Sequence, residues 1–159
     1  MDRLFSPWRY QYVTGGEKPS QPSRCIFCPP LEGHYLVFTG LHCYGLLNRF
    51  PYSSGHLMIA PLAHVSRLSD LPNRAYTEMM LYARLAEQHL FQLYRCHGLN
   101  IGFNIGASAG AGIAGHLHLH LVPRWEGDAN FMTTIGETRL LPEDLAETHR
   151  KLRSVSWEL

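Results

Sequence analysis

The most regular hydrophobic pattern in the chain alternates histidine and leucine with a period of two. It runs over residues 116–123 as His-Leu-His-Leu-His-Leu-Val-Pro. A half-buried strand satisfies such an alternation, because successive side chains of a strand point to opposite faces. The pattern therefore predicts a strand with leucines on one face and three histidines, His116, His118 and His120, on the other.

Shorter runs of apolar, β-branched and aromatic residues predict four more strands. These lie at Tyr35–Thr39, Cys43–Asn48, His56–Ala60 and Asn100–Gly106. The first three are separated by short turns, and short links favour antiparallel neighbours. We therefore expect a single antiparallel sheet of about five strands.

One long segment instead carries its apolar residues at spacings of three and four, which is typical of an amphipathic helix. These residues are Ala75, Met79, Tyr82, Ala83, Ala86, Leu90, Leu93 and Tyr94. The predicted helix opens at Pro72 and Asn73 and closes at Gly98. A short C-terminal helix is predicted to begin at Pro142-Glu143-Asp144, where the acidic residues suit the helix dipole. A sheet with these helices is an α+β fold.

Length and composition favour one domain. The chain has 159 residues, of which 45% are hydrophobic, and this is enough for one well-buried core. Residues 14–23 are polar and rich in Gly and Pro, which is typical of a loop. We therefore expect an N-terminal arm and loop over residues 1–24 and one domain over residues 25–159.

The charge pattern disfavours two classes of partner. The formal net charge is +1 and no basic block is present, so nucleic-acid binding is not expected. No apolar signal core precedes the domain, and no stretch is long enough to span a bilayer. We expect a cytoplasmic protein without membrane contact.

The three histidines of the alternating strand are the strongest candidates for chemistry. Side chains two apart on a strand lie roughly 6.5 to 7 Å from each other. The row can follow a di- or polyphosphate, or divide between a metal and a substrate. The alternative is a strand whose histidines are merely solvated or hydrogen-bonded in the core. The glycine-rich stretch of residues 104–115 before the strand argues against that alternative.

Cysteine spacing raises a metal hypothesis. Cys25 and Cys28 form a Cys-x-x-Cys pair, and His64 and His116 can complete a tetrahedral structural zinc site. Alternatively, the cysteine pair caps a turn and His64 bonds a nearby carbonyl. A third arrangement puts all three strand histidines on one metal, although ligands at i, i+2 and i+4 of a flat strand do not converge on one ion. The remaining cysteines, Cys43 and Cys96, lie in apolar patterns and are expected to be small buried hydrophobes.

These residues together resemble the histidine triad family of nucleotide hydrolases and transferases. The resemblance is carried by the 116–123 motif, the Cys25–Cys28 pair, residues 48–61, His64-Val65 and residues 104–112. Residues 6–10 and 123–132 are similar to the branch that contains diadenosine tetraphosphate phosphorylases. The resemblance implies the histidine triad fold, a symmetric homodimer and, in many bacterial relatives, zinc on the Cys and His quartet named above.

The resemblance also implies roles for particular residues. His118 is the nucleophile that forms a nucleotidyl-histidine intermediate, and its other ring nitrogen must donate to a fixed acceptor such as a backbone carbonyl. His120 donates to the phosphate. The expected nucleotide-binding residues are Ile26, Phe27 and Leu46 at the base, Asn48 at the ribose with Arg49 close by, and His56, Asn104, Ala111 and Gly112 near the phosphate. Trp125 is expected to reach a partner subunit or the second nucleoside, or to serve packing alone.

One departure from the family pattern leaves a role open. Relatives often carry Gln, Ser or Thr near the phosphate, where this chain has Ala111-Gly112-Ile113. Leaving-group assistance then falls to Ser108 or to His120. The expected function is phosphorolysis or hydrolysis of a dinucleoside polyphosphate such as diadenosine tetraphosphate. The alternatives are a purine nucleoside phosphoramidase and a nucleotide-binding protein without turnover.

Overall fold

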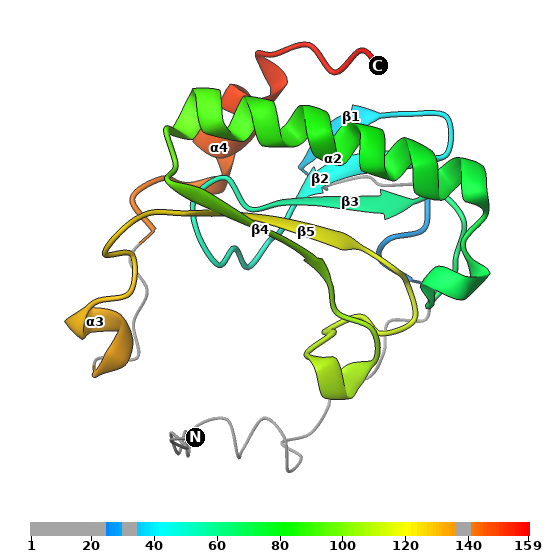
Figure 1. Ribbon diagram of the computed structural model, residues 1–159, viewed down its shortest axis with the longest axis horizontal. Coiled ribbons are helices and arrows are strands. Elements are labelled where there is room, and N and C mark those ends of the chain that lie inside the picture. The colour runs from blue at the N-terminus through cyan, green and yellow to red at the C-terminus, as the bar shows by residue number, and fades with distance from the viewer. Residues whose placement is uncertain (1–24, 30–34, 136–140) are drawn as a thin grey trace.

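The fold is built on one five-stranded antiparallel sheet (Figure 1). A computed structural model describes residues 25–29, 35–135 and 141–159, so the predicted arm of residues 1–24 lies outside the described residues. The strand order is β1-β2-β3-β5-β4. The strands are β1 (Leu36–Thr39), β2 (Cys43–Leu47), β3 (Leu57–Pro61), β4 (Gly98–Phe103) and β5 (Leu119–Arg124).

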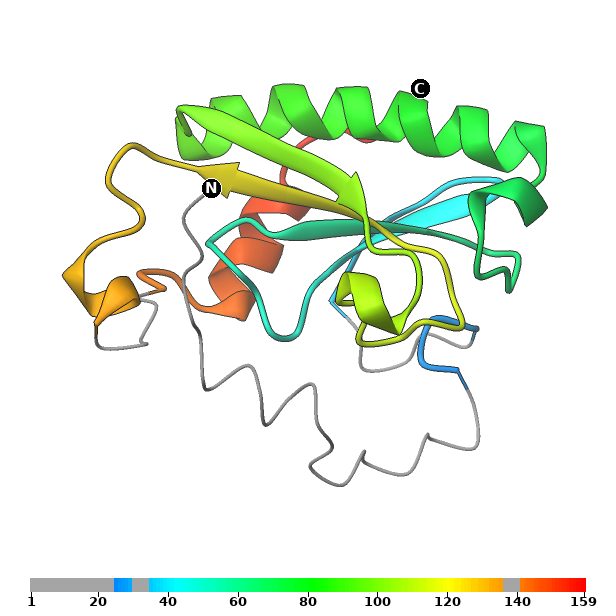
Figure 2. The same cartoon turned by 60° about the horizontal axis from the view of Figure 1, so that its bottom comes forward.

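The long helix α2 (Asn73–Tyr94) covers one face of this sheet (Figures 1 and 2). Its buried residues are Ala75, Met79, Tyr82, Ala83, Ala86 and Leu90, all of which the sequence pattern selected. They pack in one core cluster with Leu57 and Ile59 of β3 and with Leu119 and Leu121 of β5. The predicted α+β fold is confirmed. No described helix is both long and apolar enough to cross a bilayer.

The smaller elements surround this core. Helix α4 (Leu145–Arg153) contacts β1, and the Asp144 carboxylate caps it by accepting from the Glu147 backbone N–H at 2.8 Å. The further elements are α3 (Phe131–Thr134) and two 3-10 turns, η1 (Leu68–Asp70) and η2 (Ala107–Ala109). The sequence pattern did not predict these three, because each is only one turn long.

Several predicted boundaries were wrong. Helix α2 does not run to Gly98 but ends at Tyr94. The next residue, Arg95, adopts a left-handed conformation with φ 47°, and its backbone N–H donates to the Phe91 carbonyl oxygen. The strand predicted at Asn100–Gly106 is shifted toward the N-terminus: β4 begins at Gly98 and ends at Phe103, so residues 104–106 are not part of it. The predicted strand over 116–123 begins only at Leu119, although the Leu117 N–H still bonds the Val65 carbonyl at 2.6 Å.

The alternation of histidine and leucine nevertheless separates two faces. Leu117, like the two leucines of β5, lies in the core beneath α2. The expectation of a half-buried strand was wrong, because His116, His118 and His120 are only 1%, 6% and 8% exposed. The segment of residues 25–29 lies on the side of the sheet opposite α2, together with η2 (Figure 2). This side is therefore covered by segments distant in sequence.

The register of the sheet places one row of residues across the covered face. Leu46 pairs with Met58, Met58 pairs with His120, and His120 pairs with Gly102. Leu46 and Met58 are buried there with Phe27. The row therefore continues from an apolar cluster through the last histidine of the motif to a residue that has no side chain.

Candidate active site and metal centre

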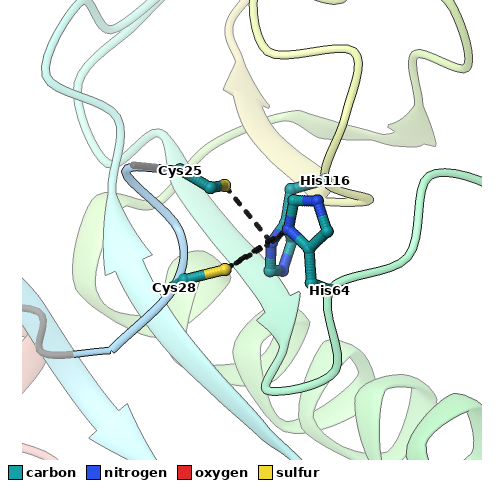
Figure 3. A group of neighbouring side chains, drawn as sticks. All are labelled: Cys25, Cys28, His64 and His116. Carbon is teal, nitrogen blue, oxygen red and sulfur yellow. Dashed lines mark hydrogen bonds between the residues drawn. The ribbon is translucent and has the colours of Figure 1, made fainter. Parts of the chain in front are cut away.

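Four side chains that the sequence selected as metal ligands converge at one point (Figure 3). Cys25 and Cys28 come from a tight turn, His64 follows β3, and His116 precedes β5. One potential ligand atom from each residue lies within 4.8 Å of those of the other three. The structure thus brings the complete predicted quartet together.

The distances within this cluster suit a tetrahedral ion. His64 Nδ1 lies 3.3 Å from His116 Nδ1, and the Cys28 Sγ atom lies 3.3 Å and 3.7 Å from these two nitrogens. The Cys25 Sγ atom is 3.6 Å from His116 Nδ1. Ligands about 2.3 Å (sulfur) and about 2.05 Å (nitrogen) from a tetrahedral zinc ion are separated by roughly 3.3 to 3.8 Å, the shortest for two nitrogens and the longest for two sulfurs. The donor set and its spacing therefore fit zinc.

The outer hydrogen bond of His116 supports the same assignment. Its Nε2 lies 2.9 Å from the Pro61 carbonyl oxygen, to which only an N–H can donate. Neutral His116 then keeps its lone pair on Nδ1, the atom that faces the cysteines. A backbone carbonyl thus fixes the imidazole in the tautomer that a metal requires. His118 and His120 lie outside this cluster, so the alternative with three strand histidines on one metal is not formed.

His118 is held in the tautomer that a nucleophile requires. Its Nδ1–H donates to the carbonyl oxygen of His116 at 2.8 Å, which leaves the lone pair on Nε2. Its ring stacks on Phe27 with a centroid separation of 4.7 Å and an interplanar angle of 27°. Burial lowers the pKa of His118, while its bond to the His116 carbonyl opposes that shift. The ring is therefore neutral at pH 7.

His120 lies beside His118, with 4.8 Å between the ring centroids. Its Nδ1 is 3.0 Å from Nε2 of His56, and His56 is 1% exposed. Burial, followed by the neighbouring His120 and then His118, lowers the pKa of His56 to about 3. Burial and then His118 lower the pKa of His120 to about 4. All three imidazoles are thus uncharged at neutral pH.

A pocket of about 690 Å³ opens next to this group. It is lined by Pro51, Tyr52, Asn100, Ile101, Gly102, Phe103, Asn104, His120, Val122 and Arg124. A Cβ atom added at Gly102, the residue paired with His120, would have no atom within 4 Å, so glycine leaves room at this point of the pocket. The pocket is large enough for the phosphate and sugar part of a nucleotide.

Of the predicted phosphate-site residues, the structure brings some to this pocket and not others. His120 and Asn104 line it, and His56 bonds His120 from behind. Ala111 is buried and its N–H bonds the Gly106 carbonyl at 3.4 Å, whereas Gly112 is exposed. Neither residue lines the pocket.

The predicted base-site residues lie nearby with mixed exposure. Phe27 and Leu46 are buried in one cluster, whereas Ile26 is 41% exposed. The Asn48 Oδ1 atom accepts from the Phe50 N–H at 2.9 Å, just beyond β2, and Arg49 is exposed. Phe27 therefore covers the ring of His118, and the polar residues Asn48 and Arg49 lie just beyond β2.

Trp125 lies in a second pocket, of about 620 Å³. Its Nε1–H donates to the Tyr94 carbonyl at 3.4 Å, and its backbone N–H donates to the Asp128 carboxylate at 3.2 Å. Asp128 is in turn held by the Arg124 guanidinium at 2.6 Å. Among the residues that the structure describes, only Tyr52 lines both pockets.

Sequence reasoning missed Tyr52. Its backbone N–H donates to His56 Nδ1 at 3.1 Å, and its ring lies over His56 with 4.7 Å between centroids. The residue falls in a Pro-Tyr-Ser-Ser-Gly turn, which predicts only a turn. Its contribution comes from a backbone group, and backbone groups carry no sequence signal. The Pro61 carbonyl was missed for the same reason.

The fold and site define a class of α+β domain in which a buried row of histidines runs from a cysteine and histidine cluster with metal-ligand spacing to a pocket large enough for part of a nucleotide. The chain belongs to the histidine triad (HIT) family. The model of the HIT domain matches residues 32–127, which is more than half of the chain.

Particular relatives agree with this assignment. The chain is 38% identical over 166 residues to a protein of Mycobacterium tuberculosis named AP-4-A phosphorylase, covering 99% of this chain and 85% of that protein. A zinc-bound histidine triad family protein from Mycobacterium smegmatis superposes with a TM-score of 0.65 at 29% identity, over 82% of this chain and 91% of the other. A hypothetical histidine triad nucleotide-binding protein from Sulfolobus tokodaii shares the fold, with a TM-score of 0.67 at 23% identity over 82% and 90% of the two chains.

Proposed function

We propose that this protein is an enzyme that cleaves dinucleoside polyphosphates such as diadenosine tetraphosphate, with inorganic phosphate as the acceptor. The observation that carries the proposal is the neutral, oriented imidazole of His118, whose Nδ1–H is tied to a carbonyl at 2.8 Å. Its Nε2 lone pair is then available to attack phosphorus. The likeness over nearly the full chain to a protein named AP-4-A phosphorylase supports this choice of substrate.

The reaction divides into two displacements at one phosphorus. His118 Nε2 attacks the α-phosphorus of one adenosine, forming a P–N bond as the P–O bond to the remaining nucleoside triphosphate breaks. ATP leaves, and AMP remains attached to the imidazole. An oxygen of inorganic phosphate then attacks the same phosphorus, the P–N bond breaks, and ADP is released. Water in place of phosphate gives AMP instead.

Neighbouring groups provide the anion site. Phosphoryl transfer depends on positioning and on stabilising charge at the non-bridging oxygens. His120 and Asn104 line the pocket and offer uncharged donors to these oxygens. We assign the base to the apolar cluster of Phe27 and Leu46 next to the exposed Ile26, and the ribose to Asn48, with Arg49 close by.

The proposal includes structural zinc on the quartet shown in Figure 3. Bound there, the ion supplies a cross-link between the turn of residues 25–28 and the histidine motif. Two thiolates and two imidazoles suit zinc, and the zinc-bound relative from Mycobacterium smegmatis supports the same metal. His116 then serves the metal through its ring and the nucleophile through its carbonyl.

Assembly and location belong to the same proposal. Strand β4 is an edge of the sheet, where Ile101 is 44% exposed, and the neighbouring helix α2 exposes Tyr76, Met80 and Phe91. An edge strand and an apolar helix surface favour a symmetric dimer. The four cysteines form no disulfide within the described part of the chain, and thiols with metal-ligand spacing suit the reducing cytoplasm. Light scattering of the purified protein tests the dimer.

Product analysis tests the activity. The metal-loaded protein is incubated with diadenosine tetraphosphate, with and without phosphate. ADP and ATP that appear only with phosphate support phosphorolysis, whereas AMP and ATP without phosphate indicate hydrolysis. Faster turnover of an adenosine phosphoramidate would reassign the enzyme as a phosphoramidase. If neither diadenosine tetraphosphate nor the phosphoramidate gives a product while the protein still binds nucleotide, the protein is a nucleotide-binding protein without turnover.

A further inference from the structure

The two histidines that contact His120, namely His118 and His56, are held in opposite tautomers by two backbone groups. His118 donates its Nδ1–H to a carbonyl oxygen, as described above. At His56 the partner is instead a backbone amide, because the Tyr52 N–H points at Nδ1 from 3.1 Å. An amide nitrogen can only donate, so His56 Nδ1 must be the acceptor.

The direction of the next hydrogen bond follows. A neutral imidazole carries one proton, and with Nδ1 accepting, the proton of His56 is on Nε2. This Nε2 lies 3.0 Å from Nδ1 of His120. The bond therefore runs from His56 to His120, and His120 Nδ1 is an acceptor as well. By the same reasoning, the one ring proton of neutral His120 is on Nε2.

Burial keeps this chain uncharged and well defined. His56 and His120 are 1% and 8% exposed, so neither exchanges its partner for water at low cost. The pKa of each is far below 7, which leaves one proton on each ring. The ring of Tyr52 lies over both imidazoles, with centroid separations of 4.7 Å from His56 and 6.0 Å from His120.

We infer that His56 is a positioning residue that transmits the direction of the Tyr52 backbone amide to His120 and so fixes His120 as an Nε2–H donor to the phosphoryl group. The inference rests on the proposed function for the phosphoryl group only. A donor of fixed orientation needs no reorganisation as negative charge develops on a phosphoryl oxygen. His118 and His120 thereby differ in role, one a lone-pair donor and the other an N–H donor, although they are the same residue type two positions apart.

Two substitutions separate the two hydrogen bonds of His56. Asparagine carries its polar atoms two bonds from Cβ, as Nδ1 is, so His56→Asn keeps an acceptor for Tyr52 and loses the donor to His120. Glutamine carries its polar atoms three bonds from Cβ, as Nε2 is, so His56→Gln keeps the donor to His120. The two variants have similar polarity, and each retains one of the two bonds.

The experiment combines ring ¹⁵N NMR with kinetics on the metal-loaded, full-length protein. In the wild-type protein without substrate we expect the signals of His120, assigned through their loss in His120→Gln, to show a proton on Nε2 and an unprotonated Nδ1. His56→Asn should remove this preference and lower kcat by about 10-fold with KM little changed, because the bond matters most in the transition state. His56→Gln should keep the tautomer of His120. Its loss of kcat should be less than about a third of the loss in His56→Asn on a logarithmic scale.

Three results would overturn the inference: a proton on Nδ1 of His120 in the wild-type protein, an unaltered tautomer and kcat in His56→Asn, or equal losses in both variants. The NMR measurement on the wild-type protein needs neither a His56 variant nor substrate. An inactive wild-type protein would therefore reject the proposed function and leave the tautomer assignment to be decided by its own spectrum.

Discussion

The Nδ1–H of His118 donates to the carbonyl oxygen of His116 across 2.8 Å, so two alternate residues of one motif are joined by a side-chain to backbone bond. The ring of His116 meanwhile belongs to the cysteine and histidine cluster. One residue thus connects the candidate metal cluster to the proposed nucleophile. The orientation of His118 depends on where the backbone at position 116 is held.

Replacement of the nucleophile tests the covalent route. His118→Ala should lower kcat by about 10³-fold or more, because the P–N bond cannot form. His120→Gln is the matched control, since it removes a donor to phosphate and should cost about 10- to 100-fold. Single-turnover assays with diadenosine tetraphosphate measure both. Turnover by His118→Ala close to that of the wild-type protein would contradict a nucleotidyl-histidine intermediate.

Metal removal should loosen both the fold and the site. One zinc ion per chain is expected by elemental analysis, and Cys28→Ser should reduce this content. Removal of the metal should lower the free energy of unfolding by several kcal/mol, which corresponds to a fall in Tm of roughly 10 °C. Cys96→Ser is the control, because Cys96 is a buried thiol outside the cluster. Equal metal content in the two variants would exclude the proposed ligand set.

The free energy of unfolding should fall as the solution is acidified. His56 and His120 have pKa values of about 3 and about 4 in the folded state, below the ordinary value of 6.5. Between these values the unfolded chain binds more protons, so stability is full above about pH 6.5 and is lost as the pH falls toward 4. Urea unfolding between pH 7.5 and 4.5, with and without chelator to separate metal loss, measures the slope.

His56→Gln provides the comparison for that experiment. Glutamine does not titrate, so the variant should show a shallower loss of stability over the same pH range. The difference should be on the order of 1 kcal/mol per pH unit where His56 is charged in the unfolded chain and neutral in the folded protein. An identical slope in the variant would mean that His56 does not contribute to the acid sensitivity.

Filling the pocket should weaken substrate binding without unfolding the protein. A Cβ atom at Gly102 would meet open space, and Gly102 lines the pocket together with His120, so Gly102→Leu should raise KM by roughly 10-fold and leave Tm nearly unchanged. Gly98→Leu is the matched control, since Gly98 lies on the same strand, also has open space, and does not line the pocket. Similar kinetics in both variants would place the substrate elsewhere.

Periodicity was informative where one physical requirement acted along a whole segment. The spacing of Ala75 to Leu90 predicted α2 because the apolar residues at that spacing are all buried in one core cluster with residues of the sheet. The alternation from residue 116 to 121 predicted two faces because the pleat allows nothing else. The ends were less predictable: Gly98 looked like a helix stop, yet Arg95 takes the left-handed conformation that ends α2. Single turns such as η2 left no periodic trace.

The sequence by itself determined which residue types were available, namely the histidine row, the cysteine pair and the apolar faces, because these are properties of side chains and their spacing. Only the tertiary structure decided that Cys25 meets His116 across 91 positions of the chain, and that the histidine face is buried. It also decided the proton positions on His118 and His56. Those depend on a carbonyl and an amide, and every residue type carries a carbonyl, so no sequence pattern distinguishes the one that is in place.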